Sequence, residues 1–236
     1  MGGVRLGVQF SKYFLRTVVI AMVLLTDAEG LAQERITLED DSVLNVFIVK
    51  SMATGSDPKP LVILMGGGPG NFSISRDTSR WLGSEFASRG WFVAVPVSPN
   101  NRAFRGAQNN QKITYLINEL RKRDDVSSGK VLLAGISNGG ISALEIARSA
   151  PRDFFGVVAV PALTTSAFDN RILQDFPVYL RIGGYDELGW ADRFGEVVEA
   201  LREAGVVLDA AIIDGAPHMF RMHWPSLDAW LQRHVD

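Results

Sequence analysis

Ten residues decide the fold: Val131-Leu132-Leu133-Ala134-Gly135-Ile136-Ser137-Asn138-Gly139-Gly140. The first six form an apolar run of strand length, and residues 139–149 have a helical pattern. Ser137 lies between the two in a Gly-x-Ser-x-Gly pattern, which is typical of a sharp strand-to-helix turn that lifts a serine hydroxyl out of a sheet. Side chains two positions before and after that serine would collide, so glycine is expected at 135 and 139. The alternative interpretation is a glycine-rich turn in which Ser137 only caps the helix.

Apolar runs alternate with stretches of helical period along most of the chain. Strand-length apolar runs separated by helices predict a parallel sheet with both faces covered. The clearest helical stripe consists of Ile113, Leu116, Ile117 and Leu120. The predicted strands are 61–65, 91–97, 131–136, 155–160, 178–182 and 207–213, and the predicted helices are 78–89, 107–123, 139–149, 191–204 and 225–233.

Two further β-rich pieces, 36–38 and 43–49, come before these elements and predict an antiparallel pair. The fold class is therefore α/β, with a mostly parallel eight-stranded sheet and helices on both faces. The interval between the strands at 155–160 and 178–182 is too short for a large lid. No repeat or linker divides residues 33–236, which are expected to form one domain.

Residues 1–32 resemble a secretory signal peptide. Arg5, Lys12 and Arg16 precede an apolar run over 18–25, and small residues follow at Gly30 and Ala32. The apolar run is shorter than the roughly 20 residues that a spanning helix needs. We therefore expect cleavage after Ala32 and a secreted or periplasmic protein without stable membrane insertion, and an uncleaved anchor is the alternative.

The composition excludes several classes of function. The 236 residues contain 24 Lys and Arg, 26 Asp and Glu, three His and no Cys, for a net charge of −2. No basic surplus supports binding to nucleic acid. The absence of Cys excludes disulfides, thiolate catalysis and Cys-ligated metal sites, and three His do not favour a His-rich metal site. No metal or cofactor is expected, and the oligomeric state is not predicted.

Glycines also follow the predicted strand at 61–65, in the run Gly66-Gly67-Gly68-Pro69-Gly70. Glycines allow backbone N–H groups to approach a ligand closely. We expect the Gly67 N–H and the Asn138 N–H to form an oxyanion hole, with Gly66 as a substitute for Gly67. A phosphate-binding loop is the alternative, but neither a Gly-Lys-Ser/Thr sequence nor a Gly-x-Gly-x-x-Gly fingerprint is present.

The last two predicted strands are each followed by a residue that suits acid–base chemistry. Asp186 follows the strand at 178–182, and His218 follows the strand at 207–213. The chain order Ser, Asp, His is the one used on sheets of this kind, with the imidazole as base and the carboxylate as its orienting partner. His223 is the alternative base, and His234 is expected to be structural. The alternative acids are Asp169, Asp175, Glu187 and Asp214.

With these motifs, the chain resembles the α/β-hydrolase superfamily over residues 36–236. Within it, the chain looks like the compact carboxylesterase, dienelactone-hydrolase and polyhydroxybutyrate-depolymerase-like group. The resemblance implies hydrolysis of a small-molecule ester through an acyl-serine intermediate, with Ser137, His218 and Asp186 as the catalytic triad and without a cofactor. The chain departs from the pattern at Met65, where many relatives have His before the oxyanion glycines. The absence of that His weakens the hydrogen-bond support of the oxyanion loop.

Three questions stay open at the level of the sequence. A prolyl-oligopeptidase-like peptidase and a non-catalytic binding protein with this fold are the alternative functions. Arg102 and Arg105 lie in a polar stretch and either meet an anionic substrate group or are solvated. Trp190, Phe220 and Trp224 either line an acyl or aryl pocket or belong to the core. A site without a lid would favour short or soluble acyl groups.

Overall fold

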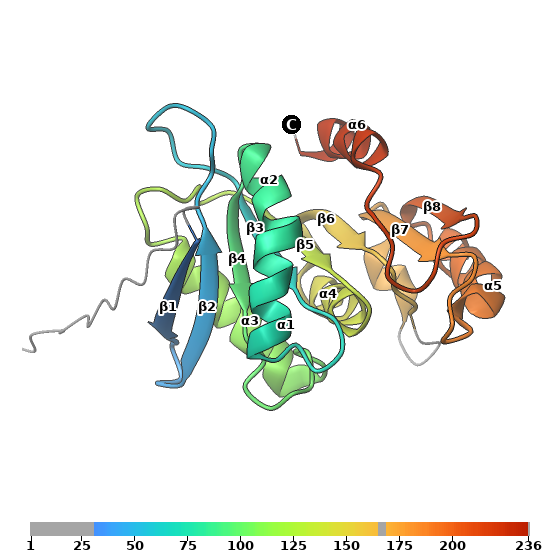
Figure 1. Cartoon of the computed structure of the whole chain (residues 1–236), viewed down its shortest axis with the longest axis horizontal. Coiled ribbons are helices and arrows are strands. Elements are labelled where there is room, and N and C mark those ends of the chain that lie inside the picture. Colours follow the sequence, from blue (N-terminus) through green and yellow to red (C-terminus); the bar gives the residue numbers. More distant parts are fainter. Residues whose placement is uncertain (1–30, 165–168, 236) are drawn as a thin grey trace, which may run out of the picture.

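A computed structural model describes residues 31–164 and 169–235 of the chain. Eight strands form one sheet in the order β1-β2-β4-β3-β5-β6-β7-β8 (Figure 1). β2 pairs antiparallel with both β1 and β4, and all the other pairs are parallel. The predicted mostly parallel eight-stranded sheet is confirmed.

The strands are β1 (Leu31–Thr37), β2 (Val43–Val49), β3 (Leu61–Met65), β4 (Phe92–Pro96), β5 (Val131–Gly135), β6 (Phe154–Ala159), β7 (Pro177–Gly183) and β8 (Val207–Ile213). The helices are α1 (Phe72–Thr78), α2 (Ser84–Ser88), α3 (Ala107–Leu120), α4 (Asn138–Ser149), α5 (Trp190–Glu203) and α6 (Trp224–His234). A π-helical turn, η1 (Ser79–Gly83), joins α1 to α2, and two short 3₁₀ turns are η2 (Pro151–Asp153) and η3 (Asn170–Leu173).

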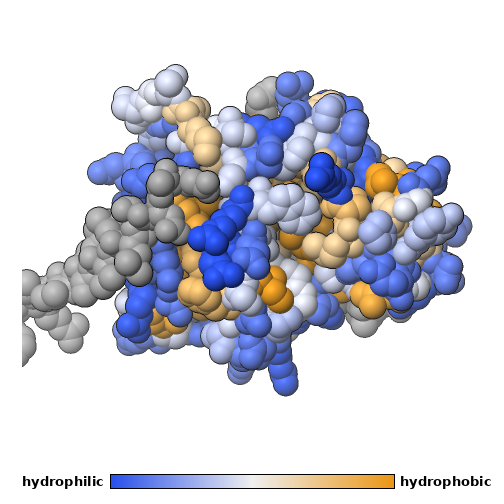
Figure 2. Space-filling model, viewed as in Figure 1, coloured by the Kyte–Doolittle hydropathy of each residue, from blue (hydrophilic) through white to orange (hydrophobic). Residues whose placement is uncertain are grey.

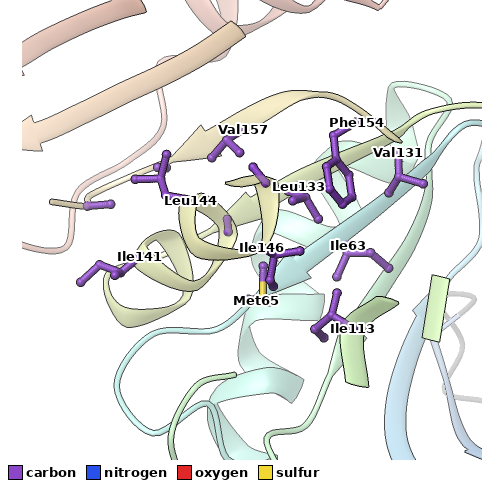
Figure 3. Packing of buried hydrophobic residues seen from close by; sticks show 14 of the residues in the cluster. Ile63, Met65, Ile113, Val131, Leu133, Ile141, Leu144, Ile146, Phe154 and Val157 are labelled. Carbon is purple, nitrogen blue, oxygen red and sulfur yellow. The ribbon is translucent and has the colours of Figure 1, made fainter. Parts of the chain in front are cut away.

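Two hydrophobic cores lie on the two faces of the sheet. Helices α3, α4 and α5 pack on one face, and the helix from α1 to α2 packs with α6 on the other. Figure 3 shows the first core around Ile63, Leu133, Leu144 and Ile146. Every residue of β3, β4 and β5 is buried, as expected for central strands covered on both sides. The surface in Figure 2 is mixed, with small hydrophobic patches between hydrophilic residues.

Most boundaries lie within three residues of the sequence-based prediction, and two element starts differ by more. The helix expected at 78–89 begins at Phe72, because the Asn71 side chain accepts a hydrogen bond from the Ile74 N–H and caps the helix. β1 begins at Leu31 rather than at Ile36, because the pairing with β2 extends from Thr37 back to Leu31. Backbone pairing stabilises this polar segment, which has no clear hydrophobic pattern.

The predicted signal peptide lies almost entirely outside the described residues, which begin with Leu31. Among the described residues, no helix is long and apolar enough to cross a membrane.

Candidate active site

Ser137 lies in a strained turn between β5 and α4. Its φ is 54° and its ψ is −119°, a conformation that non-glycine residues rarely adopt. The neighbouring glycines make room for this turn. A Cβ at Gly135 would lie 2.3 Å from the carbonyl carbon of Gly139, and a Cβ at Gly139 would lie 2.2 Å from the Met65 carbonyl oxygen. The expected need for glycine on both sides of Ser137 therefore has a direct steric cause.

The structure brings Ser137, His218 and Asp186 into one hydrogen-bonded chain. His218 Nε2 lies 3.0 Å from Ser137 Oγ, and His218 Nδ1 lies 2.7 Å from Asp186 Oδ2. All three residues are buried, and the Asp186 side chain is fully inaccessible. The second carboxylate oxygen of Asp186 accepts a hydrogen bond from the Leu188 N–H at 2.8 Å. Asp186 is therefore held at both oxygens, and it in turn orients the imidazole.

Backbone hydrogen bonds join the loops that carry Asp186 and His218. Gly184 N–H donates to the Ile213 carbonyl at 2.9 Å, and Tyr185 N–H donates to the Ala216 carbonyl at 2.8 Å. The loops also approach closely at Gly183, where a Cβ would lie 2.1 Å from the Pro217 carbonyl oxygen. These contacts fix the position of the imidazole relative to the carboxylate although the two residues are far apart in sequence.

Glu187, an alternative acid in the sequence analysis, has a different place in the site, which the sequence does not predict. Its Oε2 accepts a hydrogen bond from the backbone N–H of His218 at 2.8 Å, so it supports the base rather than serving as the acid. The His218 N–H, with the N–H of Glu187 itself, holds the pKa of this carboxyl below its usual range. The only sequence signal was its position next to Asp186, and nothing there indicated where its side chain points.

We predict that Glu187→Ala lowers kcat about two- to tenfold, because one net hydrogen bond to the His218 backbone is lost. Glu187→Gln keeps an acceptor oxygen and should recover part of the activity.

The hydrogen bonds that lower the pKa of the Glu187 carboxyl also stabilise the folded protein above pH 4.5, the ordinary value of this group. This stabilisation is lost as the pH falls through the lower pKa of the folded state. Steady-state kinetics and thermal melting from pH 3 to 8 check this. A stability difference between wild type and Glu187→Ala that grew at acid pH would contradict it.

Gly67 and Asn138, the predicted oxyanion-hole residues, both lie beside Ser137. A Cβ on Gly67 would lie 3.4 Å from the Ser137 Cβ, and Asn138 follows Ser137 at the N-terminus of α4. Within the part of the chain that the structure describes, neither backbone N–H donates to a protein acceptor. Both donors are therefore available to an oxyanion, and the dipole of α4 favours negative charge at this point.

The Asn138 side chain supplies support for the oxyanion loop. Its Nδ2 donates to the Gly68 carbonyl at 3.0 Å, which ties the loop after β3 to the start of α4. Met65, where many relatives have histidine, is completely buried and packs in the core between β3, α3 and α4 (Figure 3). Met65 therefore contributes to packing, and the Asn138 amide anchors the loop.

The alternative acids and bases lie elsewhere. Asp169 accepts hydrogen bonds from the Arg171 side chain and caps η3, and Asp175 and Asp214 are exposed. His223 is exposed at the start of α6. His234 packs against Trp230, with its pKa lowered by burial. Within residues 31–164 and 169–235, none of these side chains forms a hydrogen bond or an ion pair with the side chain of Ser137 or His218.

An apolar pocket of about 570 Å³ opens beside Ser137 and His218. Besides these two, it is lined by five apolar residues, Ile74, Trp81, Ile136, Leu188 and Met219, and by Gly67, Gly68, Asp77 and Thr78. The three aromatic residues suggested from the sequence do not line this pocket. Trp190 packs edge-on against the His218 ring, 4.9 Å between centroids, while Phe220 and Trp224 pack against the core.

Among the described residues, no three His, Asp or Glu side chains lie close enough together to hold a metal ion.

Neither a protein-family model nor a curated protein sequence matches the chain. Its structure is similar to those of known hydrolases at low sequence identity. A Pyrococcus furiosus esterase is 14% identical, with a TM-score of 0.66 over 87% of this chain and 92% of that one. Thermogutta terrifontis esterase 2, solved after phosphorylation by paraoxon, is 14% identical, with a TM-score of 0.63 over 88% of this chain and 92% of that one.

Larger peptidases also contain this architecture. The acylaminoacyl peptidase of Pyrococcus horikoshii is 13% identical, with a TM-score of 0.66 over 88% of this chain. The chain spans 42% of the length of that peptidase, whereas it spans nearly all of the two esterases. The strand order, the strand-to-helix turn at Ser137 and these similarities together show that the chain has the α/β-hydrolase fold.

Proposed function

We propose that the chain is a serine hydrolase that cleaves carboxylic esters through an acyl-serine intermediate. The observation that carries the proposal is the hydrogen-bonded chain from Asp186 through His218 to Ser137, which ends at an apolar pocket. Three such groups in hydrogen-bond reach are the arrangement that activates a serine hydroxyl as a nucleophile. The reaction needs no cofactor.

The hydrogen bonds among the three side chains support a separate role for each of them. Asp186 accepts a hydrogen bond from the Nδ1–H of His218, which leaves Nε2 as the base that faces Ser137 Oγ. His218 takes the hydroxyl proton as Oγ attacks the ester carbonyl, and then gives it to the departing alcohol. A water molecule, deprotonated by His218, then attacks the acyl-serine in the same way, which releases the acid and restores the Ser137 hydroxyl. The imidazolium that forms in each half is stabilised by the Asp186 carboxylate.

The N–H groups of Gly67 and Asn138 stabilise the oxyanion in both halves of the reaction. Such donors act strongly because they are fixed before charge develops. The Asn138 side chain is a positioning group here, because its bond to the Gly68 carbonyl holds the loop of Gly67 against α4.

The pocket changes the expectation of a short acyl group. A volume of about 570 Å³ with five apolar lining residues is large for an acetyl group and suits a longer or aromatic one. Trp81, Leu188 and Met219 are 42%, 58% and 49% exposed, so they present apolar surface at the pocket rather than in the core. We therefore include medium-chain or aromatic acyl esters in the proposal.

Trp81→Ala should lower the ratio of kcat/KM for an octanoate ester to that for an acetate ester about tenfold. The reason is the loss of apolar contact, worth on the order of 1–2 kcal/mol for a large ring that is only partly covered. Phe72→Ala is the control, because Phe72 is an exposed aromatic residue of α1, which leads into the η1 turn of Trp81, but does not line the pocket. Equal effects of the two substitutions on the ratio would contradict this role for Trp81.

A panel of 4-nitrophenyl esters and of peptidyl 4-nitroanilides, assayed on wild type and Ser137→Ala, tests the proposal. We expect Ser137-dependent hydrolysis of the esters and little cleavage of the anilides. Faster cleavage of the anilides would favour a prolyl-oligopeptidase-like peptidase. An absence of hydrolysis in both series would favour a binding protein.

The proposal includes export directed by the N-terminal segment. Leu31 pairs with Val49 and Ala32 pairs with Ile48, so cleavage after Ala32 would remove the first two residues of β1. The mass of the mature chain, recovered from the periplasm or the medium of an expressing cell, tests both export and the cleavage position.

A further inference from the structure

A second pocket, of about 420 Å³, lies beside the oxyanion loop. It is lined by Arg102, Arg105, Gly106, Asn138 and Glu145, and we call it the arginine pocket. Asn138 directly follows Ser137 in the chain, and its amide bonds to Gly68, which lines the apolar pocket. The arginine pocket is therefore lined by the residue that follows Ser137, and the Asn138 amide links it to a residue that lines the apolar pocket.

Of the two arginines in the arginine pocket, Arg105 is paired with the Glu145 carboxylate, and Arg102 is available to bind an anion. Both oxygens of the Glu145 carboxylate are occupied, one by Arg105 Nε at 3.0 Å and the other by the Gly106 N–H at 3.1 Å. The Glu145 side chain is only 5% exposed, so its carboxylate interacts with Arg105 and Gly106 rather than with solvent. The Arg102 guanidinium, in contrast, makes no hydrogen bond or ion pair with any residue in 31–164 or 169–235.

The segment that carries the two arginines is held in a strained conformation. Asn101, Ala103 and Phe104 all have positive φ, at 58°, 49° and 65°, and Ala103 and Phe104 are buried. Ala103 fixes the segment through both of its backbone groups: its N–H donates to the Pro69 carbonyl at 3.1 Å, and its carbonyl accepts from the Ser142 hydroxyl. Strain of this kind persists where the surroundings enforce it, and it is concentrated at ligand-binding and active sites.

We propose that the arginine pocket binds an anionic group of the substrate, so that the preferred ester carries a carboxylate as well as an apolar part. This rests on the proposed ester hydrolysis. The planar guanidinium of Arg102 matches a carboxylate with two parallel hydrogen bonds. Arg105 is already paired with Glu145, so it adds positive potential to the pocket but is not assigned a contact with the substrate. The substrate would then place its scissile carbonyl at Ser137, its apolar part among Trp81 and Met219, and its carboxylate at Arg102.

Two matched pairs of esters test this on the full chain, because the carboxylate could belong to either side of the ester bond. In the first pair the acyl group differs: 4-nitrophenyl hemiglutarate against 4-nitrophenyl pentanoate. In the second the alcohol differs: 4-(butyryloxy)benzoate against its methyl ester. The variants are Arg102→Gln, Arg102→Lys and, as control, Arg152→Gln. Arg152 is an exposed arginine before β6, at the opposite edge of the sheet.

Wild type should prefer the carboxylate ester in at least one pair. Arg102→Gln should lower kcat/KM for that ester about tenfold, the effect of one charge-assisted hydrogen bond, and leave the neutral partner within about twofold. Arg102→Lys should retain part of the preference, added salt should weaken it, and Arg152→Gln should leave it unchanged.

Two results would overturn the inference: no preference in either pair, or equal effects of Arg102→Gln on the carboxylate and neutral esters. Ser137-dependent hydrolysis of the neutral esters would still support the proposed function in that case. Failure of every ester with every variant would instead remove the proposed function, and the inference with it.

Discussion

Ser137→Ala should lower kcat for any ester that the protein hydrolyses by about 10³-fold or more, while the folded structure stays intact. Loss of the nucleophile stops acyl-enzyme formation, and serine hydrolases lose most of their rate enhancement when any of the three groups is removed. Among the described side chains, the Ser137 hydroxyl hydrogen-bonds only to the His218 ring, so its removal breaks one hydrogen bond and should leave the turn in place.

Ser128→Ala is the matched control for this prediction. Ser128 is exposed just before β5, at the edge of the sheet away from Ser137. Activity on 4-nitrophenyl esters and far-ultraviolet circular dichroism should be unchanged for Ser128→Ala, and the dichroism should also be unchanged for Ser137→Ala. If Ser137→Ala kept a tenth of the wild-type activity, the assignment of the nucleophile would be wrong.

Gly139→Ala should have the largest effect on stability, a loss of about 3 kcal/mol or more in the free energy of unfolding. The added Cβ would lie 2.2 Å from the Met65 carbonyl oxygen and 2.6 Å from the Gly66 carbonyl oxygen. Both are backbone atoms, so β3 or α4 must move and the oxyanion loop must move with it. Chemical denaturation monitored by fluorescence measures the loss, and surviving activity should fall as well.

Gly195→Ala provides the comparison within one protein. Gly195 lies in α5 with no atom within 4 Å of an added Cβ, so alanine should stabilise the helix by about 0.5–1 kcal/mol. Opposite signs for the two glycine substitutions would show that close approach at 139, not the loss of glycine as such, causes the destabilisation. A stable and active Gly139→Ala protein would contradict the account of the turn.

The sequence predicts the sheet and the convergence of the three central residues for a simple geometric reason. Gly135 and Gly139 mark the turn, and Asp186 and His218 follow strands that pair with each other, β7 and β8. Because parallel strands end at the same edge of a sheet, residues that directly follow them lie close together. Local spacing is then sufficient to bring Ser137, Asp186 and His218 to one edge.

The sequence does not predict contacts that depend on where a side chain points. The Asn138 amide could have faced solvent, but it bonds to Gly68 across 70 residues of chain. Glu187 could have been the acid, but it accepts the backbone N–H of His218. The apolar pocket likewise depends on Trp81, which the helix that begins at Phe72 brings to the site. None of these three features leaves a periodic pattern or a motif.

Covalent labelling with a fluorophosphonate tests the central claim most directly, because the reagent reacts with a serine only where a base activates it. Wild-type protein is labelled, digested and analysed by mass spectrometry, in parallel with Ser137→Ala and His218→Ala. We predict that the adduct lies on Ser137 in the wild type and that neither variant is labelled at a comparable rate. No adduct on the folded wild type, an adduct on another serine, or equally fast labelling of Ser137 in His218→Ala would contradict the account.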